Sequence, residues 1–547
     1  MGDLTIDSIF DAVAAAVPER ECVVDSNKRL KFSEFADRVS RLAGFFQREG
    51  LGCRTERSLL SPWQSGQDHI GLYMYNCAEY LEVEFASVSS RCAAINLNYR
   101  YVDKELAYLA KDAGLRGLIF HSEFAGRVDE LRKTQPELKM LIQVQDNSGM
   151  DLLPGAIWYE DALEGACVEH LAVTPDDLHI LYTGGTTGMP KGVLWRQADV
   201  IMAALGGRNP RGMENTVEDF VSCAMKSAGR TLPAGPFMHA SGRWTAISQI
   251  LLGNTVVIPS NTRRLDPDNI WRTVEREQCG GINIAGDAFA RPLLQQLSES
   301  EYDLSSLRML SSGAAIMSSS VKRGFMARLP GLIINDTIGA SETGPQATNT
   351  SADGKVPEGK GAFKLTSSTT ILTVGLDSLL GRNDQDIGWL ARTGRIPIGY
   401  LNDREKTEKT YPTIEGIRYA VPGDRATWSE TGEIELIGRE ASIINSGGEK
   451  IFAEEVEMAL KNHDSVFDAI VSSRPSERWG EEVVAIVKLL PNVDVVEKDL
   501  IESCAPFIAR YKLPKHIVFR DEVRRSPSGK PDYTWAKQLV AQNDKLF

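Results

Sequence analysis

The segment YTGGTTGMPKG, residues 182–192, combines the residue types that bind phosphate. Glycines let a backbone turn and bring its N–H groups against an anion, and three are available here, Gly184, Gly185 and Gly188. Hydroxyl donors and a positive charge come from four neighbours, Thr183, Thr186, Thr187 and Lys191. Because the preceding HILYT reads as a strand, the sequence predicts a phosphate-binding loop at the edge of a sheet.

The spacing within this loop excludes two familiar nucleotide-binding motifs. A Walker A loop needs a second glycine before its lysine and a Ser or Thr after it. Depending on which glycine starts the count, Met189 or Pro190 stands in that second glycine position, and Gly192 follows Lys191. The dinucleotide fingerprint G-x-G-x-x-G fails as well, because the first two glycines of the loop are adjacent.

Length and composition set the class of protein. A chain of 547 residues exceeds the roughly 250–300 residues at which single cores stop growing, so two or more domains are expected. Hydrophobic residues make up 42% and charged residues 25%, an ordinary soluble composition. The net charge of −13 argues against a nucleic-acid binder, which needs clustered Lys and Arg.

Targeting and metal signals are absent from the sequence. The N-terminus carries early acidic residues and no basic n-region, and no apolar run reaches the ~20 residues of a membrane span. The eight cysteines form no CxxC pair, and the seven histidines lack metal-ligand spacing. We therefore expect a soluble, cytoplasmic protein with reduced thiols.

The order of helical and strand-like segments predicts an α/β fold with a large N-terminal multi-sheet domain. Apolar spacing predicts helices over 32–49, 105–112 and 266–277. Short β-rich runs predict strands over 117–120, 140–144, 254–259 and 331–338. The alternation favours a largely parallel sheet.

A second, smaller α+β domain is predicted at the C-terminus. Beyond about residue 424 a strand over 432–437 leads to a glycine-rich turn and a helix over 453–462. The remaining pattern predicts strands over 469–472, 482–490 and 517–519 and a helix over 498–504. These patterns place a boundary near 439–442 and predict domains of 1–440 and 441–547.

At this point the sequence resembles a known superfamily, the adenylate-forming enzymes, which comprises acyl- and aryl-CoA synthetases, luciferases and adenylation domains. The loop at 182–192 is similar to the signature loop of that superfamily. Further similar stretches follow in family order: PFMHASGRW, SSGAAIMS, NDTIGASETG, VPGDRATW, GREASIINSGGEKIFAEEVE and RRSPSGKPDY. The resemblance extends upstream through 91–114, and stretches at 95–102, 286–293 and 394–400 look most like actinobacterial fatty-acid and steroid-carboxylate CoA ligases.

The resemblance assigns roles to individual positions. It places ATP against the loop residues named above and against nine further positions, Gly313, Ala314, Ala315, Asp336, Thr337, Ser341, Asp424, Arg439 and Lys530. Glu342 is the expected Mg²⁺ ligand, since hard cations prefer carboxylate oxygen. Lys530, Glu342 and His239 are the expected catalytic residues, with Lys530 reaching the substrate carboxylate and the α-phosphate.

The same resemblance implies an acyl pocket, a CoA tunnel and a hinge. The acyl pocket is expected at His239, Trp244, Gly313 and Gly339. The tunnel is expected at Gly447, Gly448 and Glu449, and the hinge at Ala441. Three features depart from the family pattern: Ile338 replaces a frequent aromatic, Ala441 replaces a frequent Asp or Lys, and the segment 50–76 is longer than the usual turn.

The implied activity is that of an ATP-dependent acyl-CoA synthetase using ATP, Mg²⁺ and CoA. It would activate a hydrophobic carboxylate, from a fatty acid or a steroid side chain, as an acyl-adenylate and then transfer the acyl group to CoA. Two alternatives stay open: an acyl-AMP ligase that charges a carrier protein or stops at the adenylate, and a non-catalytic nucleotide-binding homologue. A luciferase-like oxygenase is a more distant option, and a homodimer is left open.

Overall fold

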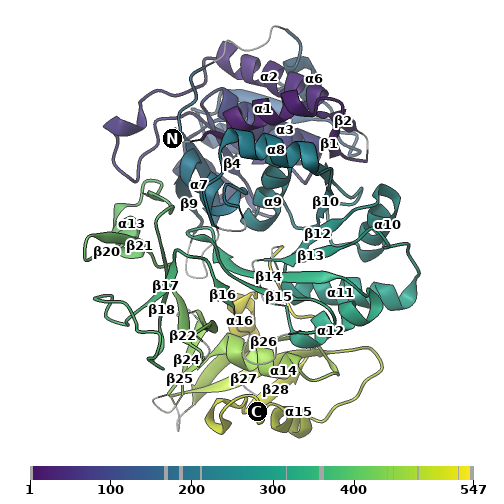
Figure 1. Cartoon of the computed structure of the whole chain (residues 1–547), viewed down its shortest axis with the longest axis vertical. Helices are drawn as coiled ribbons and strands as arrows, with labels where there is room; N and C mark the ends of the chain where they lie inside the picture. Colours follow the sequence, from purple (N-terminus) through teal and green to yellow (C-terminus); the bar gives the residue numbers. More distant parts are fainter. Residues whose placement is uncertain are drawn as a thin grey trace.

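The computed structural model describes residues 4–26, 28–165, 171–183, 189–209, 212–313, 315, 317–356, 363–430, 432–439, 442–446, 449–476, 480–527 and 529–542. Helices α1 (Ile6–Ala16), α2 (Phe32–Arg48) and α3 (Ala78–Ser89) lie at one end of the molecule, and the last sheet lies at the other (Figure 1). The two ends are joined through a long central sheet that carries β14 (Ile333–Ala340).

The first sheet is parallel throughout and buried. Its strands follow the order β4 (Ala93–Asn96), β3 (His69–Tyr73), β5 (Leu115–His121), β6 (Met140–Val144) and β7 (Ile157–Trp158). Every residue of β3 and β6 is buried, as expected for strands covered on both faces. The connecting helices are α3, α4 (Asp103–Ala113), α5 (Ala125–Thr134) and the short α6 (Tyr159–Ala162).

The central sheet has nine strands among the described residues. Their order is β16 (Lys364–Leu365), β15 (Gly344–Ser351), β14, β13 (Met309–Ser312), β12 (Gly281–Ile284), β10 (Arg230–Pro233), β11 (Thr255–Val257), β1 (Glu21–Val24) and β2 (Arg29–Lys31). The six strands from β14 to β1 run parallel to one another. The strands beyond them at both edges, β15 and β16 on one side and β2 on the other, pair in antiparallel fashion. The helices of this part are α1, α7 (Gln197–Ala204), α8 (Val217–Lys226), α9 (Ala240–Leu251), α10 (Pro267–Glu277), α11 (Gly286–Glu299) and α12 (Ser319–Arg328).

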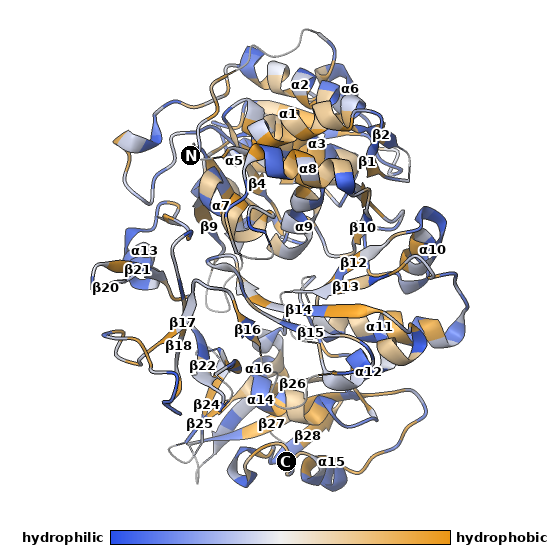
Figure 2. Ribbon diagram, in the orientation of Figure 1, coloured by the Kyte–Doolittle hydropathy of each residue, from blue (hydrophilic) through white to orange (hydrophobic). Residues whose placement is uncertain are grey.

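Local sequence explains where these helices begin. Asp266 caps α10 by accepting from the backbone N–H of Asn269 at 3.1 Å, and Pro267 occupies the first helical turn. In α1 the apolar residues face a core in which the rings of Phe10, Phe35 and Phe85 pack within 5.8 Å of each other. The apolar colouring of Figure 2 on α1 and α3 follows this burial.

The chain between the central sheet and the C-terminal unit is mostly antiparallel β-structure, of which the sequence patterns predicted only the last strand, over 432–437. One sheet contains β17 (Thr369–Leu372), β18 (Gly388–Thr393), β20 (Thr413–Ile414), β21 (Ile417–Ala420), β22 (Asp424–Trp428) and β23 (Ile434–Arg439). A smaller sheet joins β8 (Leu178–Thr183), β9 (Lys191–Arg196) and β19 (Gly399–Tyr400), and α13 (Arg404–Thr410) follows it. These strands have two to six residues each, which is too short for a period to stand out.

The C-terminal unit, from β24 to α16, has its own sheet and core. Its strands are β25 (Glu449–Phe452), β24 (Ile443–Ser446), β27 (Gly480–Leu489), β26 (Val466–Ser476) and β28 (His516–Phe519). The helices are α14 (Ala453–Lys461), α15 (Glu497–Ser503) and α16 (Tyr533–Gln542). The segments predicted here as strands and helices are all found, with ends shifted by a few residues. The predicted boundary falls at residues 440 and 441, outside the described residues, and stays a prediction.

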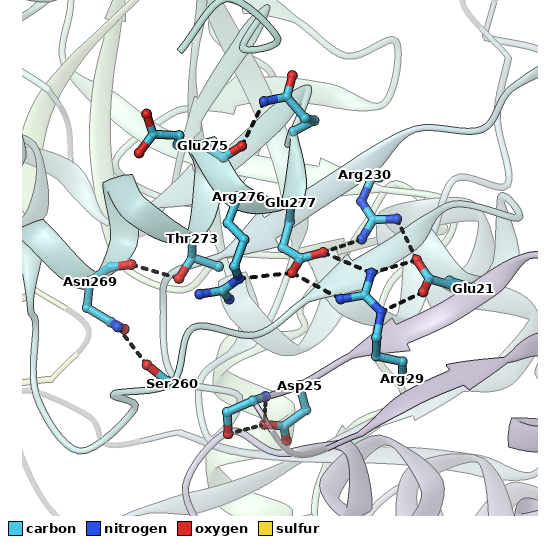
Figure 3. Close-up of polar contacts among 12 residues, drawn as sticks. Glu21, Asp25, Arg29, Arg230, Ser260, Asn269, Thr273, Glu275, Arg276 and Glu277 are labelled. Atoms are coloured by element: carbon cyan, nitrogen blue, oxygen red, sulfur yellow. Dashed lines mark hydrogen bonds and ion pairs between the residues drawn. The ribbon is translucent and has the colours of Figure 1, made fainter. Parts of the chain in front are cut away.

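An ion-pair network ties together the amino ends of strands in the central sheet (Figure 3). Glu21 and Glu277 alternate with two arginines: Arg29 reaches Glu21 at 2.7 Å and Glu277 at 3.0 Å, and Arg230 reaches both at 2.7 Å. Arg276 adds a 3.1 Å contact to Glu277. The side chain of Glu277 is only 6% exposed, so it is the carboxylate on which the network depends.

We predict that Glu277→Gln lowers the free energy of unfolding by about 1–3 kcal/mol. This loss is smaller than the loss from breaking a fully buried ion pair, because the side chain of Arg29 is half exposed. Burial raises the pKa of Glu277, but hydrogen bonds from Arg29 and its neighbours outweigh this and lower it. The carboxylate therefore stabilises the fold at neutral pH, and its contribution is lost as the pH falls through the lowered pKa. Urea unfolding at several pH values measures this, with exposed Glu301→Gln as control; an equal midpoint at neutral pH would contradict it.

Candidate functional site

Several parallel strands end at one edge of the central sheet, and the predicted site residues follow them. After β10 the chain turns to His239, which precedes α9. After β13 comes Gly313, and β14 leads directly to Ser341 and Glu342. This carboxyl edge is where ligands bind in open α/β sheets.

The C-terminal unit brings Lys530 to this edge. A tight turn holds the lysine: the N–H of Ser526 donates to the Lys530 carbonyl at 2.8 Å, and the N–H of Lys530 donates to Ser526 Oγ at 3.2 Å. Gly529 has a positive φ of 75°, and a Cβ there would lie 2.8 Å from the carbonyl oxygen of Ala285, so only glycine fits. The turn is thus pressed against the large domain at the start of α11.

The charges around Lys530 come from three predicted ATP- or metal-binding residues. Burial lowers the pKa of Lys530, and the positive charge of Arg439 lowers it further. The carboxylates of Glu342 and Asp424 act in the opposite direction. A lysine, an arginine and two carboxylates from distant parts of the chain therefore lie within electrostatic reach of one another.

Arg439 and Asp424 form a pair across two antiparallel strands. The residues face each other in the register of β22 and β23, and Arg439 Nε lies 3.0 Å from Asp424 Oδ1. The attraction of Asp424 raises the pKa of Arg439. The carboxylate is nearly buried and held in place, as expected of an acceptor for ribose hydroxyls.

Glu342 is oriented by a residue that the sequence patterns missed. The hydroxyl of Tyr400 donates to Glu342 Oε1 at 2.8 Å, and the other oxygen of Glu342 has no hydrogen-bond partner among the described residues. Burial and the charge of Glu342 raise the pKa of Tyr400, so the tyrosine remains a donor. The backbone N–H of Tyr400 in turn donates to Thr407 Oγ1 at 2.9 Å.

A divalent cation fits at Glu342 only together with ligand oxygens. Among the described residues no group of three His, Cys, Asp or Glu side chains could hold a metal ion. Mg²⁺ is usually bound by one or two carboxylates plus phosphate oxygens and water, and one oriented carboxylate with an available oxygen suits that mode.

Arg392 fixes the backbone that follows Glu342. Its guanidinium donates to the carbonyls of Thr343 and Pro345, at 2.9 Å for the latter. Burial and the nearby charge of Arg208 lower the pKa of Arg392 to about 10. This arginine and Tyr400 both come from the segment spanning β18 and β19, so that segment positions the turn and side chain of Glu342 together.

His239 lies in the site as a neutral imidazole. Burial lowers its pKa to about 3, with further contributions from the positive charges of Lys530 and Arg100. Its Nε2 is buried and has no hydrogen-bond partner in the described part of the chain. A neutral ring with an open nitrogen can exchange a hydrogen bond with a bound ligand.

A buried ion pair holds the helix that follows His239. Arg243 binds both oxygens of Glu84, at 2.8 and 3.0 Å, and the two side chains are 1% and 4% exposed. Burial alone would raise the pKa of Glu84, but Arg243 and His179 lower it to about 2. Burial and the charge of Arg243 lower the pKa of His179, whose Nδ1 lies 3.3 Å from Glu84 and whose Nε2 accepts from the Trp244 indole at 3.1 Å.

Asn96 links the strand before the phosphate loop to the turn before His239. Its amide donates to the carbonyls of Tyr182 at 2.8 Å and Met238 at 2.7 Å, and its oxygen accepts from the Tyr182 N–H at 2.8 Å. Arg243 Nη1 also reaches Asn96 Oδ1 at 3.4 Å. The side chain of Asn96 therefore holds the end of β8 and the turn before His239 in place together.

Three predicted residues are engaged away from this cluster. Lys191 lies 3.4 Å from Asp112 and 3.6 Å from Asp403. Asp336 is fully buried and pairs with Lys322 at 3.1 Å. Trp244 packs edge-on against another tryptophan ring in the core, so its place in the acyl pocket stays a prediction.

Close packing explains two of the predicted small residues. A Cβ at Gly313 would lie 3.0 Å from Ser241 Oγ, and a Cβ at Gly339 would lie 2.5 Å from the Gly344 carbonyl.

Glu449, expected in the CoA tunnel, begins β25 and is exposed. Nine expected positions lie in gaps outside the described residues, in the phosphate loop, the glycine-alanine turn, the hinge and the CoA tunnel: the five residues Gly184–Gly188, and Ala314, Ala441, Gly447 and Gly448.

The long segment 50–76, whose role the sequence did not reveal, packs beside the Tyr400 turn. The N–H of Asn402 donates to the Trp63 carbonyl at 2.8 Å, and the Arg404 guanidinium lies 5.3 Å from the Trp63 ring centre. A Cβ at Gly399 would lie 3.0 Å from the carbonyl oxygen of Pro62. The inserted residues therefore support the strand that presents Tyr400 to Glu342.

One sequence signal could have revealed the missed ion pair. Arg243 lies on an otherwise apolar face of α9, and Glu84 lies in α3, where ten of the twelve residues are buried. Charged residues are almost never fully buried unless they are paired. The two charges predict partners, but the pairing itself spans 159 residues and has no local signal.

Comparisons with known proteins agree with this geometry. A family model described as AMP-binding enzyme matches residues 10–373, and one described as AMP-binding enzyme C-terminal domain matches residues 455–530. The medium-chain acyl-CoA ligase Mig of Mycobacterium avium is 44% identical over 98% of both chains. The 3-oxocholest-4-en-26-oate–CoA ligase of Rhodococcus rhodochrous is 36% identical over 98% of this chain and 95% of its own.

The fold matches solved structures at much lower sequence identity. The anthranilate CoA ligase AuaEII, solved with anthranoyl-AMP, has a TM-score of 0.83 at 19% identity over 98% of both chains. In the described residues no helix has the length and apolar character needed to cross a membrane.

We predict that Tyr400→Phe weakens the binding of MgATP by about tenfold, a usual cost of losing a hydrogen bond to a metal-binding carboxylate. The phenylalanine keeps the ring packing and removes only the donor to Glu342. Calorimetric titration with ATP at varied Mg²⁺ measures the effect without turnover.

Tyr411→Phe is the matched control, because Tyr411 packs 5.8 Å from Tyr400 and its buried hydroxyl has no hydrogen-bond partner among the described residues. The Tyr411 variant should bind MgATP within about twofold of the unmodified protein. Equal losses in the two variants would contradict a specific role of Tyr400.

Proposed function

Because this chain belongs to the AMP-binding enzyme family, we propose that it is an AMP-forming acyl-CoA ligase for medium- to long-chain or steroid side-chain carboxylates. The observation that carries the proposal is the gathering of Lys530, Glu342, Asp424 and Arg439 at the carboxyl edge of the central sheet. These are the groups needed to hold ATP and to stabilise charge at a reacting phosphate.

In the first step a carboxylate oxygen attacks the α-phosphorus of ATP, and the bond to pyrophosphate breaks. The barrier is largely one of positioning and charge, because anionic groups must approach one another. Lys530 is proposed to hold the substrate carboxylate beside the α-phosphate. Asp424 would accept the ribose hydroxyls, with Arg439 fixing its orientation at 3.0 Å.

Mg²⁺ would be held by Glu342 and the ATP phosphates, where it would offset negative charge. The chain supplies the orientation of that carboxylate through Tyr400 and of its backbone turn through Arg392. The phosphate loop at 184–188 and Lys191 are proposed to grip the β- and γ-phosphates.

In the second step the sulfur of CoA attacks the acyl carbon, AMP leaves, and the thiol proton is released. Lys530 is proposed to act in the first step only, since an acyl-adenylate already carries its leaving group. Neutral His239, with its open Nε2, is proposed to border the acyl group where the thiol approaches.

The substrate class is proposed from the names of the relatives. The two relatives are named for a medium-chain acyl group and for a steroid carboxylate, so both have apolar acyl chains. Both relatives are named as CoA ligases, which favours CoA rather than a carrier protein as the acceptor of the acyl group.

We predict that CoA esters form with medium- and long-chain fatty acids or with 3-oxocholest-4-en-26-oate at a kcat/KM at least about 100-fold above that for acetate, because each buried methylene contributes about 0.8 kcal/mol. Mass-spectrometric detection of the esters across acetate, benzoate, C8 to C18 acids and the steroid acid measures this. Acetate as the best substrate would contradict the proposed class, and acyl-AMP without any CoA ester would favour a carrier-protein ligase.

A further inference from the structure

Helix α11 is the platform on which the C-terminal unit docks. It lies at the border of the two units, above α14 and β26 in Figure 1. A cavity of about 310 Å³ opens between them, lined by Ala288 and Phe289 of α11 and by Phe467 and Arg525 of the C-terminal unit. Because the cavity separates the two units here, the direct contacts beside it are the ones that can hold them together.

Arg291 makes two of these contacts. Its Nη1 donates to the Val466 carbonyl at 2.8 Å, and its Nη2 donates to the Lys461 carbonyl at 3.2 Å. Lys461 is the last residue of α14, so the guanidinium sits at the end of a helix where carbonyls lack partners and a cation is favoured.

The large domain holds Arg291 rigidly in place. Nε lies 3.3 Å from Asp287 Oδ2, one turn earlier in α11, and Nη2 donates to Ser318 Oγ at 3.3 Å. Asp287 also accepts from the Ser318 N–H at 2.8 Å. Arg291 is only 11% exposed in its side chain, so its direction is determined by packing as well as by these bonds.

A continuous set of contacts leads from Arg291 to Lys530. Val466 begins β26, and Asp468, two residues later, binds the Arg525 guanidinium at 2.7 and 2.8 Å. Arg525 then donates to the carbonyl of Gly529 at 3.0 Å, next to Lys530. Arg291 of the large domain thus contacts the start of β26, and β26 in turn binds Arg525, which holds the turn that carries Lys530.

We propose that Arg291 is a positioning residue for adenylate formation, which docks the C-terminal unit so that Lys530 reaches the reacting carboxylate and phosphate. The inference rests on the proposed function of Lys530 and adds a residue outside the ATP and acyl sites. Its contacts join the two units in the orientation seen here. Adenylation needs that orientation, whereas thioester formation does not need Lys530.

Arg291→Ala tests the proposal when the two half-reactions of the full-length protein are measured separately. Formation of acyl-AMP from ATP and the best carboxylate should slow by about tenfold, the effect expected from losing charge-assisted hydrogen bonds across the border. Conversion of supplied acyl-AMP and CoA to the thioester should stay within about twofold. Arg291→Lys should recover part of the adenylation rate, since one ammonium can still donate to a carbonyl.

Arg272→Ala is the control, because Arg272 lies on α10, is 59% exposed, and contacts Asp268 of the same helix and the ring of Tyr302. It should leave both half-reactions unchanged, and melting curves of all variants report folding. Equal slowing of both half-reactions by Arg291→Ala, or slowing of neither, would overturn the proposal. The unmodified protein reports separately on the proposed function: no adenylate from any carboxylate refutes that function, whatever the Arg291 variants do.

Discussion

The buried ion pair of Arg243 and Glu84 is the constraint on which the rest of the site depends. Removing two charges from water is costly, and it is tolerated only where further hydrogen bonds complete the pair. Arg243 meets that condition by also donating to the carbonyls of Ile180 and Ala94, each at 3.1 Å. The pair therefore joins α3, α9, β4 and β8 at a single point.

This point lies between the elements that matter for ligand binding. β8 ends where the phosphate loop begins, and α9 begins directly after His239. Asn96, which contacts Arg243, bonds to the backbone on both sides of this junction. The strand residue Tyr182 and the turn before His239 consequently share one set of hydrogen bonds, whereas Lys530 belongs to a separate unit that contacts α11.

The sequence predicted local structure well wherever the residues carry their own signal. The helix expected over 266–277 is found as α10, because Asp266 and Pro267 define its start. The short antiparallel strands from β17 to β22 were not predicted, since strands of two to six residues are stabilised by partners rather than by a period, whereas β23 matches the strand predicted over 432–437.

The site residues also divide into those that a local motif predicts and those that depend on distant partners. Motifs predicted Glu342, Asp424, Arg439 and Lys530, and the structure brings these four together. Motifs could not predict that Tyr400 orients Glu342, or that Asp336 turns into a core ion pair with Lys322. Both contacts join elements that are not paired in a sheet, since Tyr400 and Glu342 come from different sheets and Lys322 lies in α12, so no local pattern encodes them.

The central claim is that this chain joins AMP to a carboxylate at Lys530. Carboxylate-dependent exchange of labelled pyrophosphate into ATP, measured without CoA for the unmodified protein and for Lys530→Ala, tests it most directly. The account predicts exchange with a hydrophobic acid and a loss of at least about 100-fold in the variant, as for removal of a group that stabilises transition-state charge. Exchange that is absent with every acid tried, or that persists in Lys530→Ala, would contradict it.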